Sequence, residues 1–239
     1  MSDIIDYLIK NKDNIHLSRS IHQCAQNNDG MFVLDSRNAA LHLSRRGGMF
    51  EIGRFFSVQP AVAVVWAYGD IAYYPIGNSD AFSFDFSGCV MAAFRTTQWY
   101  AVHIQIEDHD CKEAWIRYMA ANPKIEDLVM FRPNVEEADS LSARLPKVNN
   151  KPPNIYIWGL ISTRRVCYTL YLTDNSKAEQ NFSLAGIIRH TTGYKRDYYD
   201  QLLVIRKKSI LDTVWKEFWK ERYLSQKWIY DRSDPSRVR

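Results

Sequence analysis

The sequence predicts an α+β fold, with a mostly antiparallel β-sheet or sandwich core flanked by helices at both ends and in the middle. Three observations lead to this prediction. Short runs rich in β-branched and aromatic residues alternate with Gly, Asn, Asp and Pro through the centre of the chain. Apolar residues recur at helical spacing near both termini. With 46% hydrophobic and 13% aromatic residues among 239, the chain can build a sizeable core, which excludes a largely disordered protein.

The first thirty residues are expected to be helical. Ile4, Ile5, Leu8 and Ile9 fall at helical spacing behind Ser2, which is a suitable N-cap. A second short helix is expected over 17–26.

Strands are expected to follow Asn28-Asp-Gly30, because the chain there changes to short β-rich runs separated by turn residues. These runs are 31–34, 58–68, 71–76, 81–86, 89–95 and 99–106. Their spacing predicts a mostly antiparallel sheet.

A central helix is expected from Asp110 to Ala121, because Asp110 and Glu113 resemble a capping box and Pro123 ends the pattern. Further strands over 155–162 and 166–173 are expected to form a hairpin around 163–165.

The C-terminal region is expected to contain an amphipathic helix. Ile210, Leu211, Val214, Trp215, Phe218 and Trp219 make a broad apolar face, with Lys and Glu opposite. The last residues, 231–239, are expected to fray. Residues 1–239 are interpreted as a single catalytic domain, with a subdomain joint near 149–153, where Asn and Pro are concentrated.

The distribution of charge argues against a protein that binds nucleic acid over its whole surface, and the cysteine spacing argues against a disulfide-linked protein. The formal net charge is +4, but 189–239 holds 13 Lys/Arg against 7 Asp/Glu, whereas 107–139 holds 4 against 9. The acidic stretch and the basic end are expected either to attract each other or to bind different partners, and no global nucleic-acid footprint results. Four widely spaced cysteines without a C-x-x-C pair are interpreted as free thiols: Cys24, Cys89, Cys111 and Cys167.

The N-terminus does not resemble a secretory signal, and the longest apolar run, 60–68, is far shorter than the ~20 residues of a membrane span. No transmembrane segment is therefore expected, and synthesis in a cytosol is expected.

Residues 84–106 predict a hairpin whose register follows from its hydrophobic pattern. With a three-residue loop at 96–98, the pairs Phe94/Tyr100, Ala92/Val102 and Val90/Ile104 form one wholly apolar face. The opposite face carries Cys89, Met91, Ala93 and Arg95 beside Trp99, Ala101, His103 and Gln105, and is expected to open to water. Cys89 then lies opposite Gln105 and diagonal to His103, with backbones roughly 7–8 Å apart.

A thiol beside an imidazole is a nucleophile–base arrangement. The imidazole stabilises the thiolate, which can attack a carboxamide carbon, and then protonates the departing ammonia. Gly88 would allow backbone amides to approach a developing oxyanion, and Gln105 could add a side-chain donor.

Phe86-Ser-Gly-Cys89, followed by His103, resembles the Leu-Ser-Gly-Cys signature of the cytotoxic necrotizing factor catalytic domains and of Burkholderia lethal factor. Those bacterial toxins deamidate a glutamine of a host protein, and some also transglutaminate it, on an α/β fold with a β-sandwich core and no cofactor. The resemblance implies Cys89 as nucleophile, His103 as base and Ser83 as the nearest candidate for an upstream hydroxyl. It also implies a protein substrate such as a Rho-type GTPase or a translation factor, and an immunity or chaperone partner.

Several other interpretations remain open. Cys89 and His103 can be a hydrogen-bonded core pair without chemistry. Together with His109 and Cys111 they could form a zinc site, although the spacing matches no usual zinc motif. Arg45-Arg-Gly-Gly48 could cradle phosphate but fits a plain turn better. The aromatic and basic C-terminal region could bind nucleic acid or a membrane surface, but its tryptophans fit an inward-packed helix face.

The leading hypothesis is thus a cofactor-free cysteine–histidine deamidase of protein glutamines. It would be made in a bacterial cytoplasm as an effector or toxin and delivered by a secretion system into the cytosol of another cell, with no direct nucleic-acid binding. The alternative is a non-enzymatic α/β interaction protein, such as an adaptor or immunity factor. It would bind through residues 107–139 or through the basic end.

Overall fold

The computed structural model describes residues 4–17, 28–36, 39–54, 57–66, 71–105, 111–122, 125, 127–175, 181–190, 213 and 226–238. The helices are α1 (Ile4–Lys10), α3 (Cys111–Ala121), α4 (Glu137–Arg144) and the 3-10 helix η1 (Pro235–Arg237). The strands are β1 (Ile15–His16), β2 (Asn28–Ser36), β3 (Ala39–Arg54), β4 (Ser57–Val64), β5 (Ile71–Pro75), β6 (Asp80–Ser83), β7 (Val90–Arg95), β8 (Trp99–Ile104), β9 (Leu128–Phe131), β10 (Tyr156–Ile161), β11 (Cys167–Asp174), β12 (Asn181–His190) and β13 (Gln226–Asp231).

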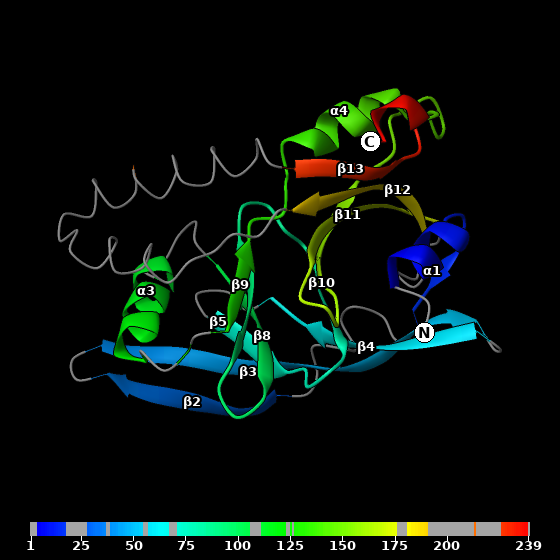
Figure 1. Cartoon of the computed structure of the whole chain (residues 1–239). Coiled ribbons are helices and arrows are strands. Elements are labelled where there is room, and N and C mark those ends of the chain that lie inside the picture. Colours follow the sequence, from blue (N-terminus) through cyan, green and yellow to red (C-terminus); the bar gives the residue numbers. More distant parts are fainter. Residues whose placement is uncertain are drawn as a thin grey trace.

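The strands form one mixed, mainly antiparallel arrangement in the order β1-β12-β11-β10-β6-β4-β3-β5-β8-β7-β9, with β13 beside β12 and β2 beside β3. The parallel neighbours are β3 with β5 and β4 with β6. The helices lie at separate places around the outside of the strands, with α4 next to β13 and α3 at the opposite side of the view from α1 (Figure 1). The predicted α+β class with an antiparallel core is confirmed.

Strand β3 connects the two halves of this arrangement and runs across the lower part of Figure 1. It pairs with β2 up to Arg46 and with β5 over Leu43–Arg45, then with β4 from Gly47 onward. The prediction of a turn or phosphate-binding loop at Arg45-Arg-Gly-Gly48 is therefore wrong. The two glycines lie where the strand changes partners, a place where missing side chains ease a bend or twist.

Four buried clusters fill the described part of the fold, and one of them packs α4 against β11 and β12 through Leu141, Tyr171 and Ile188. Of the other three, one lies under α1 and includes Leu8, Phe82 and Trp158. A second, which we call the α3 core, lies between α3 and the β7/β8 hairpin and includes Trp115 and Phe94. The third, which we call the central core, has members on every strand from β4 to β11: Val62, Val64, Ala72, Ile76, Ala81, Phe86, Cys89, Met91, Ala93, Ala101, Phe131, Ile161 and Cys167.

The expected elements are only partly right in the N-terminal region. Helix α1 is confirmed, but Ile15–His16 is a strand that pairs with β12 and Leu17 lies in a β-bridge, so the first thirty residues are not all helical. Apart from Leu17, the predicted helix over 17–26 lies outside the described residues. The central helix is confirmed as α3, and the hairpin around 163–165 is confirmed as β10 and β11. The elements that were not predicted are β1, β3, β9, α4, β12, β13 and η1.

The C-terminal predictions have mixed outcomes. The amphipathic helix at 210–219 lies outside the described residues except for Thr213, which is helical. Fraying of 231–239 is wrong for the described part: Asp231 is 2% exposed and forms ion pairs with Arg144 and Arg237. Arg237 also pairs with Glu137, so the basic end does contact the acidic stretch.

Residues 149–153, expected to be a subdomain joint, begin in a tight turn closed by a bridge between Val148 and Lys151. Strand β10, which follows the turn, pairs with β6, which precedes it. No helix within the described ranges is long and apolar enough to cross a bilayer.

Candidate functional site

The β7/β8 hairpin has the predicted register. Val90 pairs with Ile104, Ala92 with Val102 and Phe94 with Tyr100, and Arg95 faces Trp99 across the loop. The predicted apolar face packs into the α3 core, where Phe94 lies 5.9 Å from Trp115 between ring centroids. The alternation of apolar residues therefore predicted the register of this hairpin correctly.

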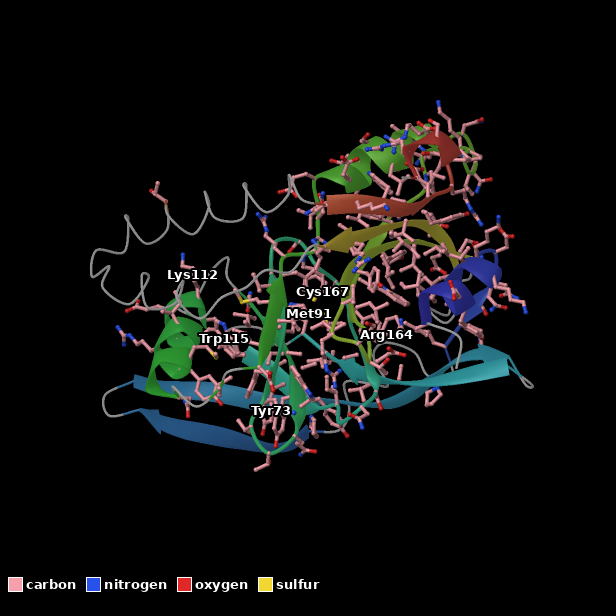
Figure 2. The ribbon with its side chains drawn as sticks, viewed as in Figure 1. Tyr73, Met91, Lys112, Trp115, Arg164 and Cys167 are labelled. Atoms are coloured by element: carbon pink, nitrogen blue, oxygen red, sulfur yellow. The ribbon has the colours of Figure 1, made fainter. Side chains whose placement is uncertain are left out.

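The opposite face of this hairpin is not open to water, so that expectation is wrong. His103 is 1% exposed, Cys89 is 3% exposed, and Met91 and Ala101 are fully buried. The physical reason is that β4, β10 and β11 cover this face and bury it in the central core. Figure 2 shows Met91 of β7 and Cys167 of β11 close together inside the molecule. The hairpin is thus buried on both sides, and the proposed nucleophile and base lie in the interior.

His103 is held by Ser83. Strand β8 pairs with β5, placing His103 beside Ala72, while β6 pairs with β4, placing Ser83 beside Val64. Ser83 Oγ lies 2.8 Å from His103 Nδ1 and donates to the Val64 carbonyl oxygen at 2.6 Å. Two candidates that lie twenty residues apart in the sequence are therefore brought into contact.

This hydrogen-bond chain fixes the tautomer of the neutral imidazole. The single Ser83 hydroxyl proton goes to the Val64 carbonyl, so Nδ1 carries the proton that Ser83 Oγ accepts. Nε2 is then the unprotonated nitrogen. It is buried and has no hydrogen-bond partner within the described part of the chain. An imidazole in this state has a lone pair with which it can accept a proton.

Phe86 covers the imidazole of His103. Their rings stack with centroids 4.4 Å apart and an interplanar angle of 10°. The Phe86 amide donates to the Ile157 carbonyl at 3.3 Å, which ties the loop to the start of β10. Burial lowers the pKa of His103 from 6.5 to about 3, so the ring is neutral at pH 7. The expected resting thiolate–imidazolium pair is therefore disfavoured.

The fit around Phe86 is tight. Gly159 of β10 lies beneath it, and a Cβ at this glycine would be 3.0 Å from Phe86 Cε2 and 2.8 Å from Met91 Sδ. Only a residue without a side chain allows this close approach of β10.

Cys89 lies at the end of the loop that joins β6 to β7. Along that loop Asp85 and Ser87 are exposed, whereas Phe86, Gly88 and Cys89 are buried. Asp85 has a φ of 58°, a left-handed conformation that a non-glycine residue rarely adopts, and such strained positions cluster at functional sites. Ser87, two residues before Cys89, is therefore the exposed residue of this loop that is nearest to the cysteine in sequence.

Gln105 follows β8 directly and is 5% exposed. Since the paired strands begin at Val90 and end at Ile104, Cys89 and Gln105 lie one residue beyond the ladder. The proposed role of Gln105 as an oxyanion donor stays a prediction.

The two other histidines whose side chains the structure describes, His16 and His190, fit structural roles. His16 Nδ1 lies 2.8 Å from Asn181 Oδ1, and His190 Nε2 lies 2.7 Å from Thr169 Oγ1. His190 is a second buried imidazole, and burial lowers its pKa to about 3. The residues next to it in the sequence did not indicate that it is buried. Cys89, Cys111 and Cys167 are thiols outside any disulfide, as predicted, and Cys24 lies outside the described residues.

The zinc alternative depends on His109, which also lies outside the described residues. Among the residues that the structure describes, no three His, Cys, Asp or Glu side chains are grouped to hold a metal ion. Neither a family model nor a curated protein matches the sequence.

Proposed function

We propose that this chain is a cysteine-dependent amidohydrolase that deamidates glutamine side chains of a target protein, as a bacterial effector or toxin. The observation that carries the proposal is the hydrogen bond between Ser83 and His103, with Nε2 of His103 left as a buried base. A nucleophile, a base and a group that orients the base form the general arrangement of covalent hydrolases. The resemblance of Phe86-Ser-Gly-Cys89 to the Leu-Ser-Gly-Cys toxins identified the same three residues.

The reaction would run through a thioester. His103 Nε2 takes the proton of the Cys89 thiol as the sulfur attacks the carboxamide carbon, and the carbonyl oxygen becomes an oxyanion. The resulting imidazolium gives its proton to the amide nitrogen, and ammonia leaves. Water then attacks the thioester while His103 again accepts a proton, which it returns to the departing sulfur. Glutamine and water thus become glutamate and ammonium, with no cofactor.

Ser83 would keep the imidazole productive in each step. By accepting from Nδ1–H, the hydroxyl holds Nε2 in the basic tautomer and stabilises the imidazolium that forms transiently. This role does not need a resting ion pair, so it agrees with the low pKa of His103.

Access would come through the 85–89 loop, which would open transiently in the substrate-free protein. Its alternate residues Asp85 and Ser87 face solvent, and displacing Phe86 from the His103 ring would uncover the imidazole. Loop motions that open and close an active site are common steps in enzymes. The substrate would be a protein, for which a Rho-type GTPase and a translation factor are the first candidates.

The experiment is incubation of the purified chain with each candidate protein and with host-cell lysate, followed by peptide mass spectrometry for conversion of glutamine to glutamate. The expected result is one or a few converted glutamines with the wild-type chain and none with Cys89→Ala or His103→Gln. Cys111→Ala is the matched control, since it removes another buried thiol and should retain conversion. Conversion that persists in Cys89→Ala would refute the proposal. Adding a primary amine in the same assay tests for transglutamination.

The burial of both groups favours one alternative, a non-enzymatic interaction protein. In that case Cys89 and His103 are a core pair, and the chain works as an adaptor or immunity factor. This alternative predicts that no glutamine is converted by any variant and that the folded chain protects Cys89 from alkylation.

A further inference from the structure

Arg132 contacts the residue immediately before the candidate nucleophile. It follows β9, and its Nε donates to the Gly88 carbonyl oxygen at 3.2 Å. Its Nη1 lies 3.7 Å from Glu136 Oε1 at the start of α4. The Arg132 side chain is 24% exposed and that of Glu136 is 53% exposed. A guanidinium thus lies between solvent and the peptide that leads into Cys89.

This contact determines the direction of the Gly88–Cys89 peptide. The peptide is trans, so the Gly88 carbonyl and the Cys89 N–H point to opposite sides. A charged donor on the carbonyl restrains the whole peptide plane, and with it the N–Cα bond that carries the Cys89 side chain. A hydrogen bond from a charged donor is also stronger than one from a neutral donor in the same geometry.

The charge of Arg132 has a second effect. A cation close to a thiol favours the thiolate and lowers the pKa of the thiol. The neutral imidazole of His103 supplies no such charge in the resting protein. Arg132 brings a positive charge to the peptide that leads into Cys89, since its Nε donates to the Gly88 carbonyl oxygen.

We propose that Arg132 is a positioning residue for Cys89, which orients the nucleophile through the Gly88 carbonyl and stabilises its thiolate by charge. The proposal rests on the proposed function, because it assigns a role in activating that same cysteine. Glu136 then tunes the effect, since its carboxylate partly neutralises the guanidinium.

The test is the rate of Cys89 alkylation by iodoacetamide in the full chain as a function of pH, followed by peptide mass spectrometry. Arg132→Met should raise the pH of half-maximal rate by about one unit, the lower end expected for a partly exposed cation near a thiol. Arg132→Lys should show less than half that shift because it keeps the charge. Glu136→Gln, an exposed substitution that should not disturb folding, should lower the midpoint.

Arg95→Met is the matched control. Arg95 lies at the far end of β7, six residues or roughly 20 Å from Cys89, and pairs with Asp127 on the surface. It should leave the profile unchanged.

Profiles of Arg132→Met and Glu136→Gln that superimpose on the wild-type profile would overturn the role of Arg132 while leaving the deamidase proposal standing. If wild-type Cys89 reacts only after unfolding, the deamidase proposal fails and this inference fails with it. The two failures are therefore distinguishable from the wild-type sample alone.

Discussion

Ser83 Oγ and His103 Nδ1 lie 2.8 Å apart in the interior of the protein, and this contact gives the imidazole a defined tautomer. The Ser83 hydroxyl is committed to the Val64 carbonyl, so the serine acts toward the histidine as an acceptor. The deamidase proposal depends on this relationship.

Replacing Ser83 with Ala should allow the neutral imidazole of His103 to carry its proton on either ring nitrogen. The variant leaves a buried N–H and the Val64 carbonyl without this partner, which should lower the free energy of unfolding by about 1–3 kcal/mol. Nitrogen NMR of the imidazole should change from protonated Nδ1 toward a tautomer mixture, and any deamidation rate should fall with it. Ser183→Ala, also a buried serine, should leave the His103 signals unchanged. A His103 spectrum that is identical in Ser83→Ala would contradict the assigned hydrogen bond.

Acid should destabilise the fold through its two buried imidazoles. Burial lowers the pKa of both His103 and His190 from 6.5 to about 3. Below pH 6.5 the unfolded chain binds protons that the folded chain excludes, so stability falls as the pH falls toward 3. Each imidazole contributes up to about 1.4 kcal/mol per pH unit in this window.

Urea unfolding of the wild type, His103→Gln, His190→Gln and the double variant checks this pH dependence. Measurements should stay above about pH 5, where carboxylates remain ionised. Each single substitution should flatten the dependence, and the double variant should flatten it most. A wild-type stability that is constant between neutral pH and pH 5 would contradict the burial of these groups in neutral form.

Removing the Phe86 ring that stacks on His103 should raise the pKa of His103. Phe86→Leu keeps the site apolar but removes the stacked ring, so water reaches the imidazole and its pKa should move up toward 6.5. NMR titration of His103 measures this shift. Phe94→Leu is the control, because Phe94 is also 4% exposed but packs in the α3 core. Equal pKa values in both variants would show that Phe86 does not exclude water from the ring.

Adding one methyl group at Gly159 should disturb the site from the β10 side. In Gly159→Ala the new Cβ clashes with Met91 Sδ and Phe86 Cε2, which should cost about 1–3 kcal/mol of stability. It should also move the His103 signals, because Phe86 stacks on that ring. Gly186→Ala is equally crowded, at 2.8 Å from Trp228, but lies in another part of the core. It should lower the melting temperature without moving those signals, and the reverse pattern would contradict the packing described.

Local pattern was sufficient to predict the hairpin but not its surroundings. Alternation of apolar residues fixed the pairing of Val90 with Ile104. It did not reveal that β4, β10 and β11 cover the second face, because those contacts join distant segments. The sequence did contain a signal: Met91, Ala93 and Ala101 make that face largely apolar, which is typical of a strand pair buried on both sides.

Two other features could not be predicted from local pattern for the same reason. The contact of Ser83 with His103 depends on β4 pairing with β6 and β5 with β8, and only the family resemblance singled out this serine. Residues 45–48 of β3 were predicted to be a turn, because the segment has the glycines of a phosphate-binding loop but lacks its Lys-Ser/Thr ending. In the fold they lie where one long strand passes from one set of partners to another.

The most direct measurement of the central claim compares the three described cysteine thiols of the folded wild-type chain during iodoacetamide treatment at neutral pH. Cys167 is fully buried, and burial raises its pKa, so it should stay protected together with Cys111. If Cys89 is a nucleophile reached through the 85–89 loop, it should be alkylated well before both of them and faster than a free peptide cysteine. Modification of all three only on unfolding would contradict the account and leave Cys89 and His103 as an inert core pair.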